Sequence, residues 1–262
     1  MTRAEATARL GVVRSAMGAA VDELARLELV RVGEQAHSPL RESAGRGRTS
    51  PRLEPAARAP LAAAVSLQPT GTDVALVQFG GAVLAQARLA PVTGRDPAAA
   101  LAPIAGWIER SLRAAGRPCL GVGVGVAGIV SGDGRSIVSA LYLDWHDVSV
   151  ADILSTLLPT ELPVRAHNDG SLTAFAEYHH GAGRDAATLL VLGCEHVGIS
   201  GAMLTQSAAQ AASLPAPDHA FELGHLALDP YGPPCPCGQR GCLELYCDGR
   251  ALNRALGRAE TD

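Results

Sequence analysis

The chain contains no lysine and few aromatic residues. All 22 of its basic residues are arginine, and Phe, Trp and Tyr together make up 3% of the 262 residues. We interpret the absence of lysine as a codon preference of GC-rich DNA, not as a chemical requirement. Hydrophobic residues make up 47% of the chain, so the expected core is ample but aliphatic and rich in alanine. The length fits one large domain or two small ones.

Two kinds of apolar segment are also absent. No apolar run is long enough to span a bilayer, and the amino-terminal stretch lacks the apolar region of a signal peptide. The sequence therefore predicts a cytoplasmic protein with reduced cysteines and no membrane partner. The net charge is −4, yet residues 1–60 hold ten arginines against seven acidic residues. This basic start favours a DNA-binding segment, although an ordinary solvated surface explains it almost as well.

The first 60 residues predict two helices and a basic loop-rich segment. Residues 2–10 predict a short helix, Gly11 a turn, and residues 14–29 a longer amphipathic helix. The apolar positions of the longer helix are Met17, Val21, Leu24 and Leu27. A helix, a tight turn and a second helix form the helix-turn-helix pattern. Residues 32–60 predict a wing and a linker, and a flexible charged linker alone fits them as well.

From residue 61 onward, predicted strands alternate with predicted helices, which indicates an α/β fold. Residues 74–79 and 82–89 predict a hairpin that turns at two glycines, and residues 98–116 predict a helix that begins near Pro103. Further strands are predicted at residues 120–126, 164–168, 187–192 and 196–205. Further helices are predicted at residues 148–158 and 170–181.

A cysteine-rich loop near the carboxyl end predicts a metal site. Its candidate ligands, all within eighteen residues, are His225, Cys235, Cys237 and Cys242. Zinc takes four such ligands in a tetrahedron, and a closed set of three cysteines and one histidine is typical of a structural site. Gly238 and Gly241 allow the tight turn that the loop needs. A reduced thiol cluster without metal is the alternative, but this density of ligands favours Zn²⁺.

These residues resemble the signature of the ROK family of repressors, open reading frames and sugar kinases. The matching segments are Glu222-Leu-Gly-His225, then Cys235-x-Cys237-Gly-x-x-Gly-Cys242-Leu-Glu244, and the pair Asn168-Asp169 after a predicted strand. The resemblance implies an actin-like, ribonuclease-H-like α/β sugar-kinase fold of two lobes in residues 61–262. It also implies a degenerate winged helix-turn-helix and linker in residues 1–60. We further expect that the carboxyl-terminal part of the second lobe is missing.

The resemblance also implies a sugar-binding site. The residues that would contact the sugar hydroxyls are Asn168, Asp169, Glu222, His225 and Glu244. Carboxylates accept hydrogen bonds from hydroxyls, and an asparagine both donates and accepts. His225 would serve the metal and the sugar together, so that zinc holds the sugar site in place. Taken singly, Glu222 and Glu244 could be surface acids, and Asp169 could be a helix N-cap.

The phosphate-binding segments of the family's kinases are altered here. Residues 66–70 read Ser-Leu-Gln-Pro-Thr where kinases have Asp-x-Gly-Gly-Thr, and residues 194–198 replace a Gly-Thr-Gly-x-Gly run and include Glu195. Proline removes an amide donor, and Glu195 would repel a polyphosphate. We therefore expect no catalytic residue and no enzyme activity. In a kinase, the residue matching Asp169 would take the proton from the attacking hydroxyl.

The expected function is a sugar-responsive transcriptional regulator, a repressor, that binds DNA. The candidate DNA contacts are Arg14 and Ser15 at the start of the second helix, with Arg46 and Arg48 in the wing. A sugar bound between the lobes would change the spacing of two DNA-binding heads in a homodimer. The alternatives are an ATP-dependent hexose kinase and a sugar-binding remnant with neither activity. The sequence identifies neither the sugar nor the operator.

Overall fold

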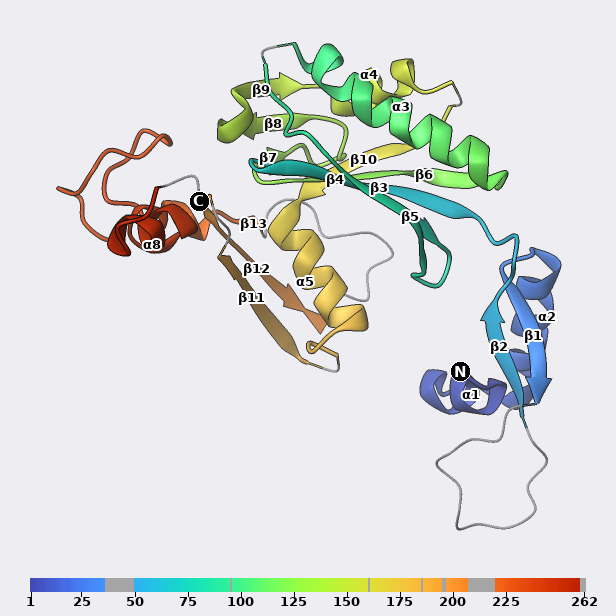
Figure 1. Cartoon of the computed structure of the whole chain (residues 1–262). Coiled ribbons are helices and arrows are strands. Elements are labelled where there is room, and N and C mark those ends of the chain that lie inside the picture. Colours follow the sequence, from blue (N-terminus) through green and yellow to red (C-terminus); the bar gives the residue numbers. More distant parts are fainter. Residues whose placement is uncertain are drawn as a thin grey trace.

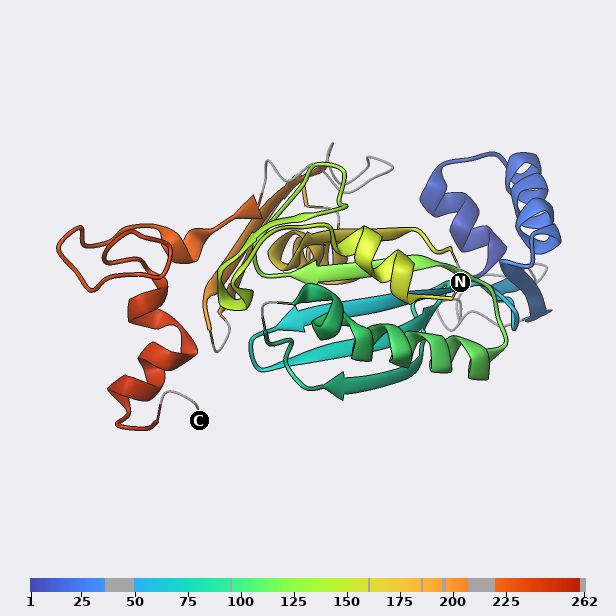
Figure 2. The same ribbon diagram turned by 90° about the horizontal axis from the view of Figure 1, so that it is seen from above.

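A computed structural model describes residues 1–35, 50–94, 96–159, 161–184, 186–194, 197–206 and 220–259. The chain forms an amino-terminal segment of two helices and a hairpin, then a first lobe, then a smaller second lobe (Figures 1 and 2). In the described part of the chain, no helix has both the length and the apolar character that crossing a membrane requires.

The amino-terminal segment holds helices α1 (Arg3–Leu10) and α2 (Arg14–Arg26) and the antiparallel strands β1 (Val30–Gln35) and β2 (Pro51–Pro55). Gly11 ends α1 with a left-handed φ of 62°. A small core joins these elements and consists of Ala6, Met17 and Val21, with Leu53 packed against it. The second helix was predicted to reach residue 29 but ends at Arg26, because Glu28 adopts a positive φ of 55°, and Leu27 is 49% exposed.

The first lobe is built on a five-stranded mixed sheet with the order β10-β6-β3-β4-β5. Its strands are β3 (Leu61–Gln68), β4 (Gly71–Gln78), β5 (Val83–Leu89), β6 (Cys119–Val126) and β10 (Val164–Asn168). The first three pair antiparallel, while β6 lies parallel to both β3 and β10. Val126 is in register with Asn168 and with Leu67, so three strands end together at one edge. Ligand sites of parallel α/β sheets lie at such edges.

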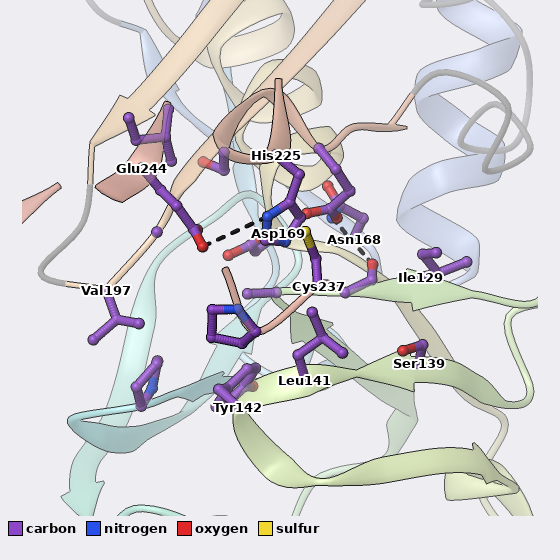
Figure 3. Close-up of a pocket in the computed structure, with 18 of the residues that line it drawn as sticks. Ile129, Ser139, Leu141, Tyr142, Asn168, Asp169, Val197, His225, Cys237 and Glu244 are labelled. Atoms are coloured by element: carbon purple, nitrogen blue, oxygen red, sulfur yellow. Dashed lines mark hydrogen bonds and ion pairs between the residues drawn. The ribbon is translucent and has the colours of Figure 1, made fainter. Parts of the chain in front are cut away.

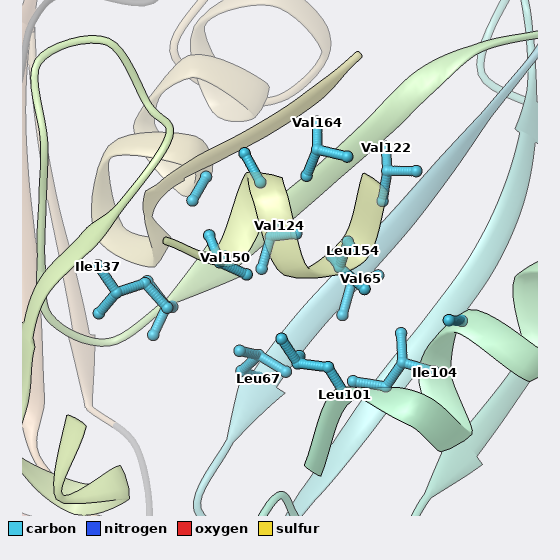
Figure 4. Close-up of a cluster of buried hydrophobic side chains, with 14 of the residues drawn as sticks. Val65, Leu67, Leu101, Ile104, Val122, Val124, Ile137, Val150, Leu154 and Val164 are labelled. Atoms are coloured by element: carbon cyan, nitrogen blue, oxygen red, sulfur yellow. The ribbon is translucent and has the colours of Figure 1, made fainter. Parts of the chain in front are cut away.

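Two helices, α3 (Pro97–Ala115) and α4 (Val150–Leu157), cover one face of this sheet (Figures 1 and 4). Their buried side chains pack against the alternate, inward-facing residues of the strands. Those shown from the helices are Leu101, Ile104, Val150 and Leu154, and those from the strands include Val65, Leu67, Val122, Val124 and Val164. The core is aliphatic, as the composition predicted. Its close packing supports the sheet edge rigidly.

The start of α3 differs from the prediction. The helix begins at Pro97, and Pro103 lies inside it. Asp96 is the N-cap, with a side chain that accepts hydrogen bonds from the amides of Ala98 and Ala99 at 3.0 and 3.3 Å. A capping aspartate followed by proline at the first helical position is a strong start signal, and here it outweighs the helix-breaking tendency of Pro103.

A second antiparallel sheet in the first lobe lies between β6 and α4 in sequence and was not predicted. It consists of β7 (Ile129–Val130), β8 (Ile137–Ala140) and β9 (Trp145–Val148), with a 3-10 turn, η1 (Leu141–Leu143), before β9. Trp145 is 1% exposed and anchors this sheet in the main core.

The second lobe contains a three-stranded antiparallel sheet of β11 (Thr188–Cys194), β12 (Ile199–Thr205) and β13 (Ala220–Phe221). Helix α5 (Asp169–His180) follows β10 directly and packs against this sheet through Ala174. The remaining elements are η3 (Leu223–His225), α7 (Glu244–Cys247) and α8 (Gly249–Ala255). The predicted hairpin, the strand at residues 164–168 and the helix after it are therefore confirmed, with boundaries that shift by a few residues.

Candidate functional site

A cavity of about 520 Å³ lies between the two lobes, and we refer to it as the interlobe cavity. The first lobe contributes the end of β10 and residues of the unpredicted sheet, including Ser139, Leu141 and Tyr142. The second lobe contributes residues from β12, η3, α7 and the cysteine-rich loop. All five residues predicted to contact a sugar line this cavity: Asn168, Asp169, Glu222, His225 and Glu244. Figure 3 shows Asn168, Asp169, His225 and Glu244 opposite Leu141 and Tyr142.

Asn168 and Asp169 reach the cavity because β10 ends there and α5 begins there. Asn168, not Asp169, is the N-cap of α5: its Oδ1 accepts from the amide of Ser171 at 3.1 Å. Its side-chain amide donates to the carbonyl oxygen of Gly128 at 3.1 Å. The Oδ1 of Asp169 accepts from the amide of Gly170 at 2.8 Å. Burial raises the pKa of Asp169, although the bond from Gly170 opposes this shift.

Glu222 and Glu244 enter the cavity from the second lobe. Glu244 is 7% exposed, so it is no surface acid. Glu222 keeps contact with solvent, but the surrounding protein still raises its pKa by desolvation, and the charges of Asp169 and Glu244 add to the increase. His225 opposes it. Three carboxylates that share one cavity favour a ligand with several hydrogen-bond donors, such as a polyhydroxyl compound.

The four predicted metal ligands form a compact group, which we call the His–Cys cluster: His225, Cys235, Cys237 and Cys242. Their ligand atoms all lie within 4.8 Å of one another. The Nδ1 of His225 is 3.5 Å from the Sγ of Cys235, and the Sγ atoms of Cys237 and Cys242 are 3.6 Å apart. With Zn–S distances near 2.3 Å, tetrahedral ligands lie about 3.8 Å apart. The cluster can therefore hold a tetrahedral metal ion of the zinc type.

The loop geometry and the thiol environment agree with that use. Gly238 and Gly241 have φ values of 91° and 61°, and a Cβ at Gly241 would lie 1.8 Å from the carbonyl oxygen of Asp229. Burial raises the pKa of the Cys235 and Cys242 thiols. Gathering thiols in this way disfavours thiolates unless a cation compensates, which is the role that a bound metal would fill.

His225 connects the cluster to the cavity. Its Nδ1 faces the thiols and is also 3.5 Å from Oε1 of Glu244, while the side chain lines the cavity (Figure 3). The Cys235 thiol donates to the same Oε1 of Glu244 at 3.2 Å. A metal on Nδ1 would leave Nε2 for a ligand in the cavity, and the cluster would fix the orientation of Glu244 as well.

Tyr142 is a cavity residue that the sequence reasoning missed. Its hydroxyl donates to the carbonyl oxygen of Leu67 at 2.8 Å, 75 residues earlier in the chain. Burial and the nearby charge of Asp169 raise its pKa. It therefore remains a neutral phenol that presents an aromatic surface to the cavity. No local motif marks this residue, because its position depends on a contact between two distant segments.

A smaller hollow of about 250 Å³ adjoins the interlobe cavity at the end of β3 and is lined in part by Ser66, Gln68 and Thr70. Arg88 lines this hollow and donates hydrogen bonds to Asp73 at 2.8 Å and to Thr70 at 2.9 Å. This is the segment predicted to replace the first phosphate-binding loop of the kinases. Among the described residues that line the hollow, Arg88 is the one cation, and Asp73 of the same chain engages it.

The segment predicted to replace the second phosphate loop, residues 194–198, contacts the carboxylate of Asp248. The amide of Gly198 donates to Oδ2 of Asp248 at 3.3 Å, and Asp248 is 1% exposed. Arg250 donates to the same oxygen from Nε at 2.8 Å and from Nη2 at 2.6 Å. The amide of Gly198, in the segment predicted to replace a phosphate loop, therefore has an acceptor within the chain. Glu195 lies outside the described residues.

The predicted DNA contacts are only partly described. Arg14 and Ser15 are exposed on the first turn of α2. Its N-cap, Val13, makes no side-chain capping bond. Arg46 and Arg48 lie outside the described residues.

A family model described as the ROK family matches residues 63–262. The chain belongs to the ROK family. Kanosamine kinase from Amycolatopsis mediterranei (strain S699) is 31% identical over 188 residues, which cover 70% of this chain and 58% of the kinase. The xylose repressor of Bacillus subtilis (strain 168) is 28% identical over 142 residues, which cover 54% of this chain and 35% of the repressor. The chain spans about half the length of the curated ROK relatives that it matches.

Solved structures of both kinds of ROK protein share the fold. A ROK family transcriptional regulator, a homologue of the E. coli MLC protein, superposes with a TM-score of 0.69 over 98% of this chain and 63% of its own, at 19% identity. A ROK family glucokinase from Streptomyces griseus, in complex with glucose and AMPPNP, gives a TM-score of 0.60 over 74% of this chain and 59% of its own, at 27% identity. The first of these likenesses concerns the fold alone.

Proposed function

We propose that this ROK protein is a sugar-responsive transcriptional regulator that acts as a repressor. The observation that supports the proposal is that all five predicted sugar contacts line one cavity, while Arg88 and the amide of Gly198 beside it bind carboxylates of the chain itself. Asn168, Asp169, Glu222, His225 and Glu244 would bind the sugar hydroxyls. Zn²⁺, held by the His–Cys cluster, would fix His225 and Glu244 against the sugar.

The amino-terminal segment would bind DNA. Two helices joined by a tight turn, followed by an antiparallel hairpin, have the order of a winged helix-turn-helix. Helix α2 would enter the major groove with Arg14 and Ser15 leading, and Arg46 and Arg48 would contact the minor groove or phosphates. As a winged helix-turn-helix the segment would be degenerate, because Val13 provides no cap and Gly18 lies inside α2.

A sugar in the interlobe cavity would couple the two regions. The cavity uses residues from both lobes, so a ligand that contacts both favours one angle between them. In a homodimer that angle would set the distance between two DNA-binding segments. The cytoplasm is where such a regulator would meet DNA.

The second candidate function is an ATP-dependent hexose kinase. It is favoured by Asp169, whose carboxylate lies in the cavity with a raised pKa, as befits a group that accepts a proton. It is opposed by Pro69 in the first phosphate loop and by the Gly198–Asp248 bond in the second. The kinase relatives make this candidate worth a direct measurement.

The test is binding of the full chain to duplex DNA from upstream of its own gene, with and without a panel of hexoses and pentoses, by fluorescence anisotropy. We expect binding that one sugar weakens by tenfold or more, and an Arg14→Ala/Ser15→Ala variant that loses DNA affinity but keeps its sugar-induced thermal shift. No DNA binding, together with sugar-dependent ADP release from ATP, would replace the regulator with the kinase. A sugar-induced thermal shift with neither activity would indicate a sugar-binding remnant.

A further inference from the structure

Two exposed cysteines lie close together outside the His–Cys cluster. Cys194 ends β11 and Cys247 ends α7, 53 residues later. The thiol of Cys194 donates to the carbonyl oxygen of Cys247 at 3.2 Å, and both side chains are exposed. Figure 1 shows the end of β11 beside the segment that leads into α8. Neither cysteine belongs to the metal-ligand group.

The surrounding contacts hold the two segments together. The Gly198–Asp248 hydrogen bond of 3.3 Å joins them one residue after Cys247 and four residues after Cys194. The Cys247 thiol donates to the carbonyl oxygen of Leu243 at 3.3 Å, within its own helical turn. A bridge therefore requires this side chain to leave that weak bond and turn toward Cys194, which already lies against its backbone.

We propose that Cys194 and Cys247 are a redox-active pair that forms a reversible disulfide on reaction with hydrogen peroxide. One thiolate attacks a peroxide oxygen, which breaks the O–O bond and leaves a sulfenic acid and one water. The second thiol attacks the sulfenic sulfur, forms the S–S bond and expels the oxygen as a second water. Two thiols thus lose two electrons and two protons to one hydrogen peroxide molecule.

The environments of the two thiols assign the order of these steps. Partial desolvation by the surrounding protein raises the pKa of the exposed Cys247 thiol, and the charges of Cys194 and Asp248 raise it further. The thiolate is the nucleophile, so Cys247 is poorly suited to the first attack. Cys194 therefore reacts with the peroxide and Cys247 resolves the sulfenic acid.

The bridge would act on the wall of the interlobe cavity. Val197 and Gly198 follow Cys194 and line the cavity, and Glu244 begins the helix that Cys247 ends. A disulfide would fix these two walls relative to each other. Oxidation would therefore change the rate of ligand entry and release without removing a ligand-binding group.

The test is peptide mapping of the full, metal-replete chain after treatment with one to five equivalents of hydrogen peroxide. We expect a Cys194–Cys247 crosslink as the first disulfide, loss of two of the three thiols that lie outside the His–Cys cluster, unchanged zinc content, and full reversal by dithiothreitol. Cys194→Ser and Cys247→Ser should each abolish the crosslink. The matched control is Cys119→Ser. Cys119 begins β6 in the first lobe, where its thiol donates a hydrogen bond to the carbonyl oxygen of Gly121, so this variant should leave the crosslink unchanged.

Two results would overturn this inference: a first disulfide that involves Cys235, Cys237 or Cys242, or oxidation of Cys194 to the sulfinic acid with no crosslink. Neither readout depends on DNA or sugar. The redox pair and the proposed regulator can therefore fail separately.

Discussion

The side-chain amide of Asn168 lies 3.5 Å from Oε1 of Glu222, across the boundary between the two lobes. Asn168 ends the edge strand β10 of the first lobe, whereas Glu222 immediately precedes η3 of the second lobe. The same asparagine caps α5 through its Oδ1. One side chain thus starts a helix, and its opposite face is directed to the interlobe cavity. Its two roles can be separated by mutation.

Asn168→Ser should separate capping from ligand binding. Serine still offers an acceptor to the amide of Ser171, so we expect a Tm close to that of the wild type. It cannot supply the amide that reaches Glu222, so the sugar-induced thermal shift should disappear. Asn168→Ala loses the cap too, which costs about 1 kcal/mol and lowers Tm by roughly 2–4 °C. An unchanged sugar response in Asn168→Ser would remove Asn168 from the binding site.

Asp169→Asn should stabilise the free protein at neutral pH. Because the native pKa of Asp169 is raised above the unfolded value, the native state binds the extra proton between the two. Wild-type stability therefore falls as pH rises from the unfolded pKa, about 3.9, through the native pKa. The variant escapes this loss, so its advantage in urea unfolding should be present at pH 7 and shrink toward pH 4.

Asp133→Asn is the control for that experiment. Asp133 is exposed, and a hydrogen bond from Ser131 lowers its pKa, the opposite direction. Its neutralisation should give no gain at pH 7. If both variants gain equally at pH 7, the effect comes from net charge and not from the burial of Asp169.

Strands of the main sheet and the residues of the metal and sugar sites could be predicted from the sequence, but the cavity wall opposite those residues could not. Residues 164–168 read Val-Arg-Ala-His-Asn, with Val164 and Ala166 buried on one face, and both ends of that strand were predicted. The β7–β9 sheet escaped because β7 has two residues and is defined only by pairing with β8. Tyr142 entered the cavity through a bond to Leu67 that no local pattern encodes.

The site residues that were predicted all belong to short motifs with fixed spacing. The three thiols are held by one loop, so their proximity follows from local turns at Gly238 and Gly241, and His225 lies in η3 a few residues before that loop. Asp248 and Arg250 were not predicted to matter, because their role depends on the approach of Gly198 from another strand. Spacing thus predicts contacts within a loop, whereas contacts between segments require the fold.

Cys237→Ser should empty the His–Cys cluster and loosen the sugar site together. The variant removes one of four ligands, so we expect zinc content, by plasma mass spectrometry, to fall from about one per chain to well below half. The fit of His225 and Glu244 to a sugar should weaken in parallel, and a chelator should produce the same loss in the wild type. Cys119→Ser is the matched control and should retain both. A wild-type chain without stoichiometric zinc would contradict the metal assignment.

Asp248→Ala should be among the most destabilising single substitutions in the second lobe. The carboxylate is buried and accepts from the amide of Gly198, from Arg250 and, as the N-cap of α8, from the amide of Ala251 at 2.8 Å. Removing it leaves a partly buried arginine and two amides without their partner, which costs about 3 kcal/mol in urea unfolding. Asp248→Asn keeps an acceptor for Ala251 but not the charge, so it should cost less stability than Asp248→Ala.

If Asp248 prevents a phosphate from binding at the amide of Gly198, Asp248→Asn should also gain affinity for ATP, measured by calorimetry. Equal stability of the alanine variant and the wild type would show that this carboxylate does not hold the loop of Gly198 in place.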